Sequence, residues 1–140
     1  MATTGFNGPG EIIVMIGKNS GHLGCSLLLR VIAGLDRGAP PPVDLSAERR
    51  NGDFVRGLIQ TNKVLACHDV SDGGMLVTVA EMVLASGIGA ELQLTTKDLP
   101  ALAWYFGEDQ GRYVISVFDA DPIIAAAKLA DVPATVLGTT

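Results

Sequence analysis

Apolar residues occur along this chain in short runs that are separated by glycine-rich polar segments. The first run, EIIVMI at residues 11–16, is almost wholly apolar and is followed by Gly17. Such a run is typical of a strand that is buried on both faces. Later runs of the same kind predict strands at residues 64–67, 90–94, 112–118 and 132–137.

One helix is predicted between a proline-rich segment and the second strand. Asp44 or Ser46 can cap its start, and residues 61–63 end it. Its apolar positions recur at helical spacing, so that a single face is apolar. These positions are Phe54, Val55, Leu58 and Ile59.

Further helices are indicated elsewhere in the chain. Residues 75–85 are apolar nearly all round and predict a buried helix that stops at Ser86-Gly87. Residues 25–32 predict an apolar-rich helix that ends at Gly34, and residues 95–111 are less regular, with room for one short helix. A last helix begins at Asp121, with Pro122 in its first turn.

The order of these elements predicts the fold class. From residue 64 onward the order is β-α-β-β-α-β, the ferredoxin-like arrangement. We therefore expect an α/β (α+β) fold with a ferredoxin-like core, to which the N-terminal strand and two helices are additions, and a sheet covered by helices. We expect residues 11–140 to form one domain and residues 1–10 a flexible lead-in or linker. Residues 36–43, which contain three successive prolines, are expected to form an extended connector.

Composition narrows the possible functions. The chain has 140 residues, of which 48% are hydrophobic and 18% charged, which excludes a disordered chain. Its net charge of −5 gives no electrostatic footprint for nucleic acid or an anionic membrane. No apolar run approaches the roughly 20 residues of a membrane span. Cys25 and Cys67 are far apart and lack a metal-binding pattern, so we expect no metal site and a reducing, cytoplasmic setting.

The segment HDVSDGG, residues 68–74, is the most informative one. It leaves a strand and opens a helix, where unpaired N–H groups and a partial positive charge favour an anion. Two glycines there allow a phosphate to approach the backbone closely. The alternative is structural, with Ser71 or Asp72 as helix cap and Gly-Gly as a tight turn. The candidate residues for substrate or phosphate binding are Asp69, Ser71, Asp72, Gly73 and Gly74.

Two further polar loops are candidates for ligand or interdomain contacts. The loop at residues 17–24 offers Lys18, Ser20 and His22, although it can also be a plain surface connector. The other loop precedes a strand, and its alternative is a solvated turn in which Arg112 pairs with a neighbouring acid. Its candidate residues are Glu108, Asp109, Gln110 and Arg112.

The chain offers no set of residues for acid–base catalysis. His68 can act as a general base, but without a second base or a nucleophile beside it a role in orienting the loop is favoured. Cys67 is expected to be a small core residue, and Trp104, Tyr105 and Phe106 to cover a core edge. We therefore assign no catalytic residue and no metal ligand.

Four segments carry a resemblance to a known family: GHLGCSLLLR, GAPPPVDLSAERRNGDFVRGLI, ACHDVSDGGMLVTVAEMVLASGIGAEL and FGEDQGRYVISV. In this order they closely resemble the phosphoribosylformylglycinamidine synthase family. The wider family includes aminoimidazole ribonucleotide synthetase, selenophosphate synthetase and thiamine-monophosphate kinase. The resemblance extends from about residue 11 to residue 138 and is to the C-terminal domain of the second of two repeated halves.

The resemblance implies an ATP-dependent C–N ligase of purine biosynthesis. Formylglycinamide ribonucleotide, glutamine-derived ammonia and ATP would give formylglycinamidine ribonucleotide, ADP and phosphate, with Mg²⁺ neutralising phosphate charge. The implied partners are ATP-binding domains of the same synthetase and a glutaminase subunit. We expect the chain alone to be inactive, to hold neither ATP nor Mg²⁺ tightly, and to form a homodimer at high concentration through exposed apolar surface.

Two other readings use the same residues. The chain can be a stand-alone ligand-binding module of ferredoxin-like topology, or an assembly domain whose polar loops only dock neighbouring domains. For the residues of the Gly-rich loop and of the 108–112 loop, the resemblance implies phosphate, nucleotide or interdomain contacts and no acid–base chemistry.

Overall fold

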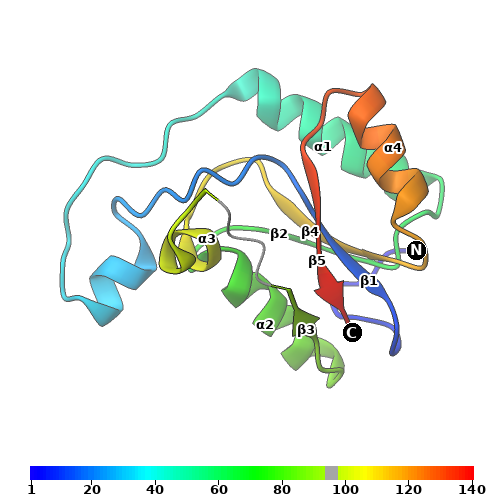
Figure 1. Ribbon diagram of the computed structural model, residues 1–140, viewed down its shortest axis with the longest axis horizontal. Helices are drawn as coiled ribbons and strands as arrows, with labels where there is room; N and C mark the ends of the chain where they lie inside the picture. The colour runs from blue at the N-terminus through cyan, green and yellow to red at the C-terminus, as the bar shows by residue number, and fades with distance from the viewer. Residues whose placement is uncertain (94–97) are drawn as a thin grey trace.

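The computed structural model describes residues 1–93 and 98–140, which form an antiparallel sheet flanked by helices (Figure 1). The strands are β1 (Ile12–Ile16), β2 (Ala66–Asp69), β3 (Glu91–Leu92), β4 (Tyr113–Val117) and β5 (Ala134–Thr139). The helices are η1 (Leu28–Ile32), α1 (Leu45–Gln60), α2 (Gly74–Ser86), α3 (Ala101–Phe106) and α4 (Asp121–Leu129). The predicted α/β class, with helices covering a sheet, is confirmed.

The strand order places β1 at the centre of the sheet. The order is β2-β4-β1-β5-β3, and β1 pairs antiparallel with both β4 and β5. The antiparallel β2–β4 pair of a ferredoxin-like core is present. However, β1 is the central strand where we expected an addition, and β3 pairs with β5 where that core would place it beside β4. The physical reason is that β1 is apolar on both faces and needs cover on both.

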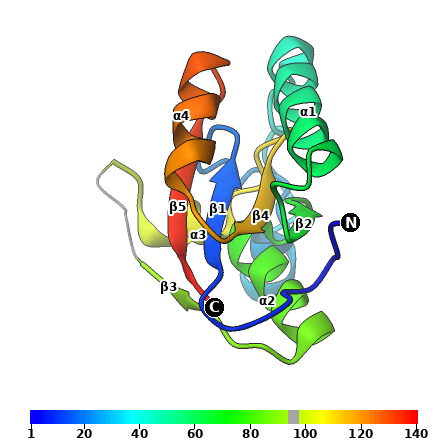
Figure 2. The same ribbon diagram turned by 90° about the vertical axis from the view of Figure 1, so that its right-hand side faces the viewer.

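Two apolar cores lie on opposite faces of the sheet. Side chains alternate along β1, so that Val14 and Ile16 join a core with α1 and α4, whereas Ile13 and Met15 join a core with α2. Figure 2 shows α1 and α4 side by side over one face and α2 beneath the other. The domain therefore has three layers, helix, sheet and helix.

Most predicted helices are confirmed, with one shortened. Asp44 caps α1 by accepting hydrogen bonds from the backbone N–H groups of Ser46 and Ala47, each at 3.0 Å. The helix predicted at residues 25–32 is reduced to η1 because Cys25 has a φ of 59° and no residue of η1 is buried. The strand predicted at residues 90–94 is limited to β3, and position 94 lies outside the described residues.

The N-terminal residues differ from the expected flexible lead-in. Thr3 forms a parallel bridge with Ala66, and Phe6 is buried in the core on the α2 face. The backbone N–H of Thr3 and the side-chain Nδ2 atom of Asn7 both donate hydrogen bonds to the carbonyl of Leu65, at 3.0 Å and 2.9 Å. Residues 1–10 thus lie along the β2 edge of the sheet, because a buried aromatic side chain and backbone hydrogen bonds hold them there.

Residues 22–43, which we call the arm, extend away from the sheet (Figure 1). Only Ser26 is buried in this segment, and Val31 and Ile32 of η1 are 65% and 76% exposed. The arm is closed at its base, where the N–H of Cys25 donates to the carbonyl of Arg37 and the ring of His22 bonds to the carbonyl of Ala39. No helix within residues 1–93 and 98–140 is long and apolar enough to cross a membrane.

Candidate functional site

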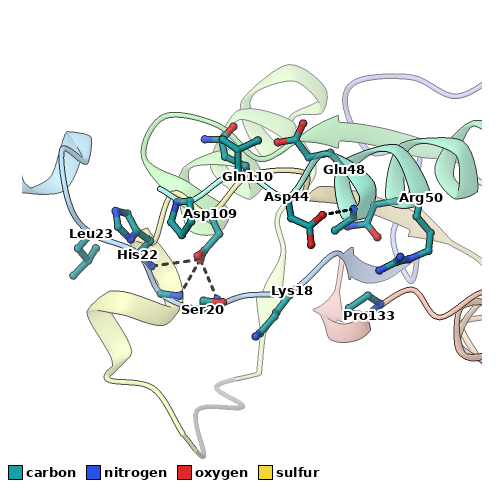
Figure 3. Close-up of a pocket in the computed structure, with 15 residues that line it drawn as sticks. Lys18, Ser20, His22, Leu23, Asp44, Glu48, Arg50, Asp109, Gln110 and Pro133 are labelled. Atoms are coloured by element: carbon teal, nitrogen blue, oxygen red, sulfur yellow. Dashed lines mark hydrogen bonds between the residues drawn. The ribbon is translucent and has the colours of Figure 1, made fainter. Parts of the chain in front are cut away.

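Two neighbouring cavities lie where the three predicted polar loops meet. The larger, of about 620 Å³, is shown in Figure 3 and lies between residues 18–23, the start of α1, and Asp109 and Gln110. The smaller, of about 390 Å³, lies beside the Gly-rich loop at the start of α2. Glu48 and Gln110 line both cavities, so the two share a wall. We call them the large cavity and the Gly-loop cavity.

The structure distributes the predicted residues between these cavities. Lys18, Ser20, His22 and Asp109 line the large cavity. Asp69, Ser71, Asp72, Glu108 and Arg112 line the Gly-loop cavity. Gly73 and Gly74 line neither cavity and are buried. The predicted ligand and interdomain residues are thus brought together, although the two glycines lie beneath the cavity walls and not in them.

Asp109 holds the loop after β1. Its Oδ2 atom accepts hydrogen bonds from the backbone N–H groups of Ser20 (3.0 Å), Gly21 (2.9 Å) and His22 (3.4 Å), as the dashed lines in Figure 3 show. Three successive N–H groups that converge on one oxygen atom form a concave anion-binding surface. That surface is filled by a carboxylate of the chain itself, so the loop at residues 17–24 is ordered from within.

Glu108 holds the start of α2 in a similar way. Its Oε1 atom accepts hydrogen bonds from the backbone N–H of Gly73 and from that of Leu27, each at 2.7 Å. Its own N–H donates to the carbonyl of His22 at 2.8 Å. Glu108 therefore joins its own loop to two segments that are distant from it in the sequence: the arm, at His22 and Leu27, and the Gly-rich loop, at Gly73.

Arg112 holds the loop that carries these two acids by hydrogen bonds to its backbone. It is 1% exposed, and its Nε and Nη2 atoms donate to the carbonyls of Asp109 (2.9 Å) and Gly107 (2.6 Å). The predicted pairing with a neighbouring carboxylate is thus replaced by hydrogen bonds to the backbone. Burial lowers the pKa of Arg112, and the charges of Asp109 and Glu108 oppose that shift. The guanidinium remains charged and keeps the 107–112 loop in one conformation.

Gly73 and Gly74 are required by backbone conformation and packing. Their φ angles are +84° and +74°, in a region of backbone conformation that residues other than glycine rarely adopt. A Cβ at Gly74 would lie 2.6 Å from the carbonyl oxygen of Gly107. The structure assigns the N-cap of α2 to Gly73 without a side-chain cap bond, so the predicted cap at Ser71 or Asp72 is wrong. The reason is that Glu108 already satisfies the N–H of Gly73.

His68 makes local contacts. Its Nδ1 atom is 2.8 Å from the carbonyl oxygen of Asp69, and its Nε2 atom lies 3.7 Å from the carboxylate of Glu81. The side chain lines neither cavity. This placement fits the prediction that His68 orients the loop.

Cys67, Trp104 and Tyr105 pack as expected for residues at a core edge, whereas Phe106 is not part of either core. Cys67, Trp104 and Tyr105 are half-buried against the two apolar cores. Burial, with a contribution from the charge of Asp69, raises the pKa of the Cys67 thiol to about 11. The thiol is therefore protonated at neutral pH and is a poor nucleophile.

Among the cavity-wall residues that the sequence did not predict are Glu48 and Asn51 of α1, and Tyr113 of β4. Asn51 is 4% exposed and donates from Nδ2 to the carbonyl of Gly111 at 2.9 Å. Burial raises the pKa of Tyr113, with smaller contributions from Cys67 and Asp69. A polar residue on the core-facing side of α1, one turn before Val55, was the signal that could have identified Asn51.

The family model described as "AIR synthase related protein, C-terminal domain" matches residues 8–140. Phosphoribosylformylglycinamidine synthase subunit PurL of Parvibaculum lavamentivorans is 55% identical over 142 residues, which cover 99% of this chain and 19% of that protein. The same subunit of Nitrobacter hamburgensis is 48% identical over 141 residues, with the same coverage. The chain thus spans about a fifth of the length of these curated relatives.

Solved structures share the fold at lower sequence identity. Thermotoga maritima PurL complexed with FGAR superposes with a TM-score of 0.82 at 20% identity, covering 99% of this chain and 25% of that chain. Escherichia coli HypE, a hydrogenase maturation protein, superposes with a TM-score of 0.65 at 22% identity, covering 99% of this chain and 46% of that chain. The same domain fold thus occurs in proteins with different names and roles.

Proposed function

The chain belongs to the family of AIR synthase related proteins, C-terminal domain, and we propose on this basis that it serves as one domain of a phosphoribosylformylglycinamidine synthase. The observation that carries the proposal is its 55% identity with a PurL subunit over 99% of the chain. The proposed reaction joins ammonia to formylglycinamide ribonucleotide at the expense of ATP, in the cytoplasm. The amide oxygen is phosphorylated, and ammonia then displaces phosphate to form the amidine.

In this proposal the chain binds and positions a phosphate or nucleotide, and other parts of the synthetase supply the catalytic groups. The residues available at the Gly-loop cavity are Ser71 and Asp72, and the N–H of Gly73, at the start of α2, is bonded to Glu108, which is also a wall residue; a helix start of this kind suits a phosphate or nucleotide. Among the described residues, no group of three or more His, Cys, Asp or Glu side chains could hold a metal ion. Mg²⁺ would therefore be bound mainly by phosphate oxygens and by other domains.

The remaining partners are proposed on the same basis. A chain in the solved structure of PurLQS from Thermotoga maritima shares this fold with a TM-score of 0.75, covering 99% of this chain and 23% of that chain. We propose that the exposed arm and the loop at residues 17–24 contact other domains of the synthetase, and that a glutaminase subunit supplies the ammonia. The isolated chain would hydrolyse no ATP above a protein-free blank, and self-association through its exposed apolar residues would be measurable by sedimentation.

A second candidate function is a purely structural domain. The N–H groups of Gly73 and Gly74 are already bonded, to Glu108 and to the carbonyl of Ser71 respectively. Both glycines are also buried. These contacts favour a role in which the Gly-rich loop only sets the geometry of the interdomain surface.

A chimeric enzyme tests the proposed function. The matching region of the Parvibaculum PurL subunit is replaced by this chain, and the chimera is expressed in a bacterial strain that lacks its own synthase. Growth without added purine, together with amidine formation by the purified chimera, is expected. A chimera carrying the corresponding domain of HypE is the matched control, because it keeps the fold at 22% identity and should not support growth. Failure of a folded chimera carrying this chain would contradict the proposal.

A further inference from the structure

We propose that Glu108 is a resident anion that holds an oxyanion site at the start of α2 closed, and that a phosphoryl group of the ligand exchanges with it. The exchange would also release the arm. This inference rests on the proposed function for the identity of the ligand, and it concerns the regulation of the same site. It is carried by the contacts of Glu108 and Arg112.

The Glu108 carboxylate lies at the N-terminus of α2. Its Oε1 atom lies 2.7 Å from the N–H of Gly73, at the N-terminus of a helix of 13 residues. The aligned peptide dipoles of such a helix give its first turn a partial positive charge, which favours an oxyanion. Gly73 is buried, so an external anion reaches its N–H only when the Glu108 side chain moves aside.

Arg112 provides the second, independent observation. The side chain of Arg112 is 1% exposed and forms part of the wall of the Gly-loop cavity. Its Nη1 atom has no hydrogen-bond partner among the residues that the structure describes. A buried, charged donor without a partner is costly, and an oxyanion beside it removes that cost.

Glu108 also connects this site to the arm. The same Oε1 atom that accepts from Gly73 also accepts from the N–H of Leu27, directly before η1. When a ligand draws this oxygen away from Gly73, the bond to Leu27 breaks as well. The remaining hydrogen bonds between the arm and the rest of the described chain are both at its first residue, His22, and no residue of η1 is buried. Binding of the ligand therefore frees the arm to change its position.

The charges around the cavity define the form of the ligand. Three further acids, Glu48, Asp69 and Asp72, line the Gly-loop cavity and would repel a phosphoryl group that has no bound cation. We therefore expect the phosphoryl group to bind as its Mg²⁺ complex, which reduces that repulsion. The probe for the experiment is accordingly pyrophosphate in the presence of magnesium chloride.

The experiment uses the 140-residue chain and two readouts. Pyrophosphate binding is measured by calorimetry, and the hydrogen exchange of the Leu27 amide by NMR. Glu108→Gln weakens the internal bonds, so it should tighten binding by about tenfold and make Leu27 exchange fast without ligand. Arg112→Lys should weaken binding by about tenfold. Glu91→Gln, at an exposed position of β3, removes the same charge and should change neither readout.

Saturation of the unmodified chain should raise the Leu27 exchange rate by at least about tenfold, the equivalent of one charge-assisted hydrogen bond. The proposal is overturned if Glu108→Gln binds as weakly as Arg112→Lys, because Glu108 would then be a ligand contact. Binding that leaves Leu27 unchanged, or no binding by either the unmodified chain or Glu108→Gln, also overturns it. A chimera that grows while this exchange fails leaves the proposed function intact. A chimera that does not grow, together with a confirmed exchange at Glu108, would contradict the proposed function and support the exchange.

Discussion

Glu11 and Ser116 are joined inside the sheet, where the Ser116 hydroxyl donates a hydrogen bond to Glu11 Oε2 at 2.5 Å. The other oxygen of this 2%-exposed carboxylate accepts from the N–H groups of Asn7 (2.8 Å) and Gly8 (2.7 Å). Ser116 in turn accepts from the N–H of Ala66 at 3.1 Å. A single buried acid thus ties the N-terminal residues to β4 and, through Ser116, to β2.

Loss of this buried pair should destabilise the domain. Glu11→Ala leaves three donors without their acceptor and is expected to lower the free energy of unfolding by about 2–3 kcal/mol, and Ser116→Ala by about 1–2 kcal/mol. Because the two side chains are in contact, the double variant should lose less than the sum of the two. Urea unfolding measures all three variants. Strict additivity would contradict a direct interaction between them.

Asp109 should control the conformation of the loop at residues 17–24. Asp109→Ala removes three charge-assisted hydrogen bonds to Ser20, Gly21 and His22, and we expect a loss of about 1–3 kcal/mol in the free energy of unfolding. Exchange of these three backbone amides should become faster by NMR. Asp36→Asn, at an exposed arm position, is the control and should leave both measurements unchanged. Amide protection that survives in Asp109→Ala would show that other contacts order the loop.

Gly74 and Gly89 should differ strongly in their tolerance of the same substitution. Gly74→Ala places a Cβ 2.6 Å from the carbonyl oxygen of Gly107, at a φ of +74°. Positive φ and overpacking together should cost about 2–5 kcal/mol. Gly89→Ala has no atom within 4 Å of its Cβ, so it should be close to neutral. Thermal melts compare the two, and equal melting temperatures would refute the described packing at Gly74.

The two cysteines should differ in reactivity and in its pH dependence. Cys25 is exposed, whereas burial raises the pKa of Cys67 to about 11. At pH 8, iodoacetamide should therefore label Cys25 at least about ten times faster than Cys67, as mass spectrometry of the labelled chain can measure. Equal rates in the folded chain would contradict the burial of the thiol.

The raised pKa of Cys67 also affects stability. Above pH 9 the folded state holds the thiol proton more tightly than the unfolded chain does. The stability that this provides is fully present below about pH 9, the ordinary pKa, and decreases as the pH rises towards 11. Cys67→Ala should remove this part of the alkaline loss in urea unfolding at pH 8 and pH 10.5. An unchanged pH dependence in that variant would contradict the assignment to Cys67.

The local pattern of apolar and polar residues predicted most helices and strands of this fold. The EIIVMI run is buried in β1, and the residues at helical spacing around Val55 and Leu58 form the buried face of α1. Gly87 ends α2 in the left-handed conformation, as a glycine after an apolar helix predicts. Burial and local backbone preference depend on residues near in sequence, so a single chain can reveal them.

The sequence alone thus determined the class of fold, the extent of most elements and the three loops that carry polar groups. Only the tertiary structure decided that β1 is central and that the acid of one loop fills the anion-binding positions of another. Glu108 reaches Leu27 and Gly73 across 81 and 35 positions, and Asn51 of α1 meets Gly111 across 60. Such contacts depend on how strands pair and layers pack. Strand order is set by the burial of whole faces and the closure of long loops, which no local run of residues contains.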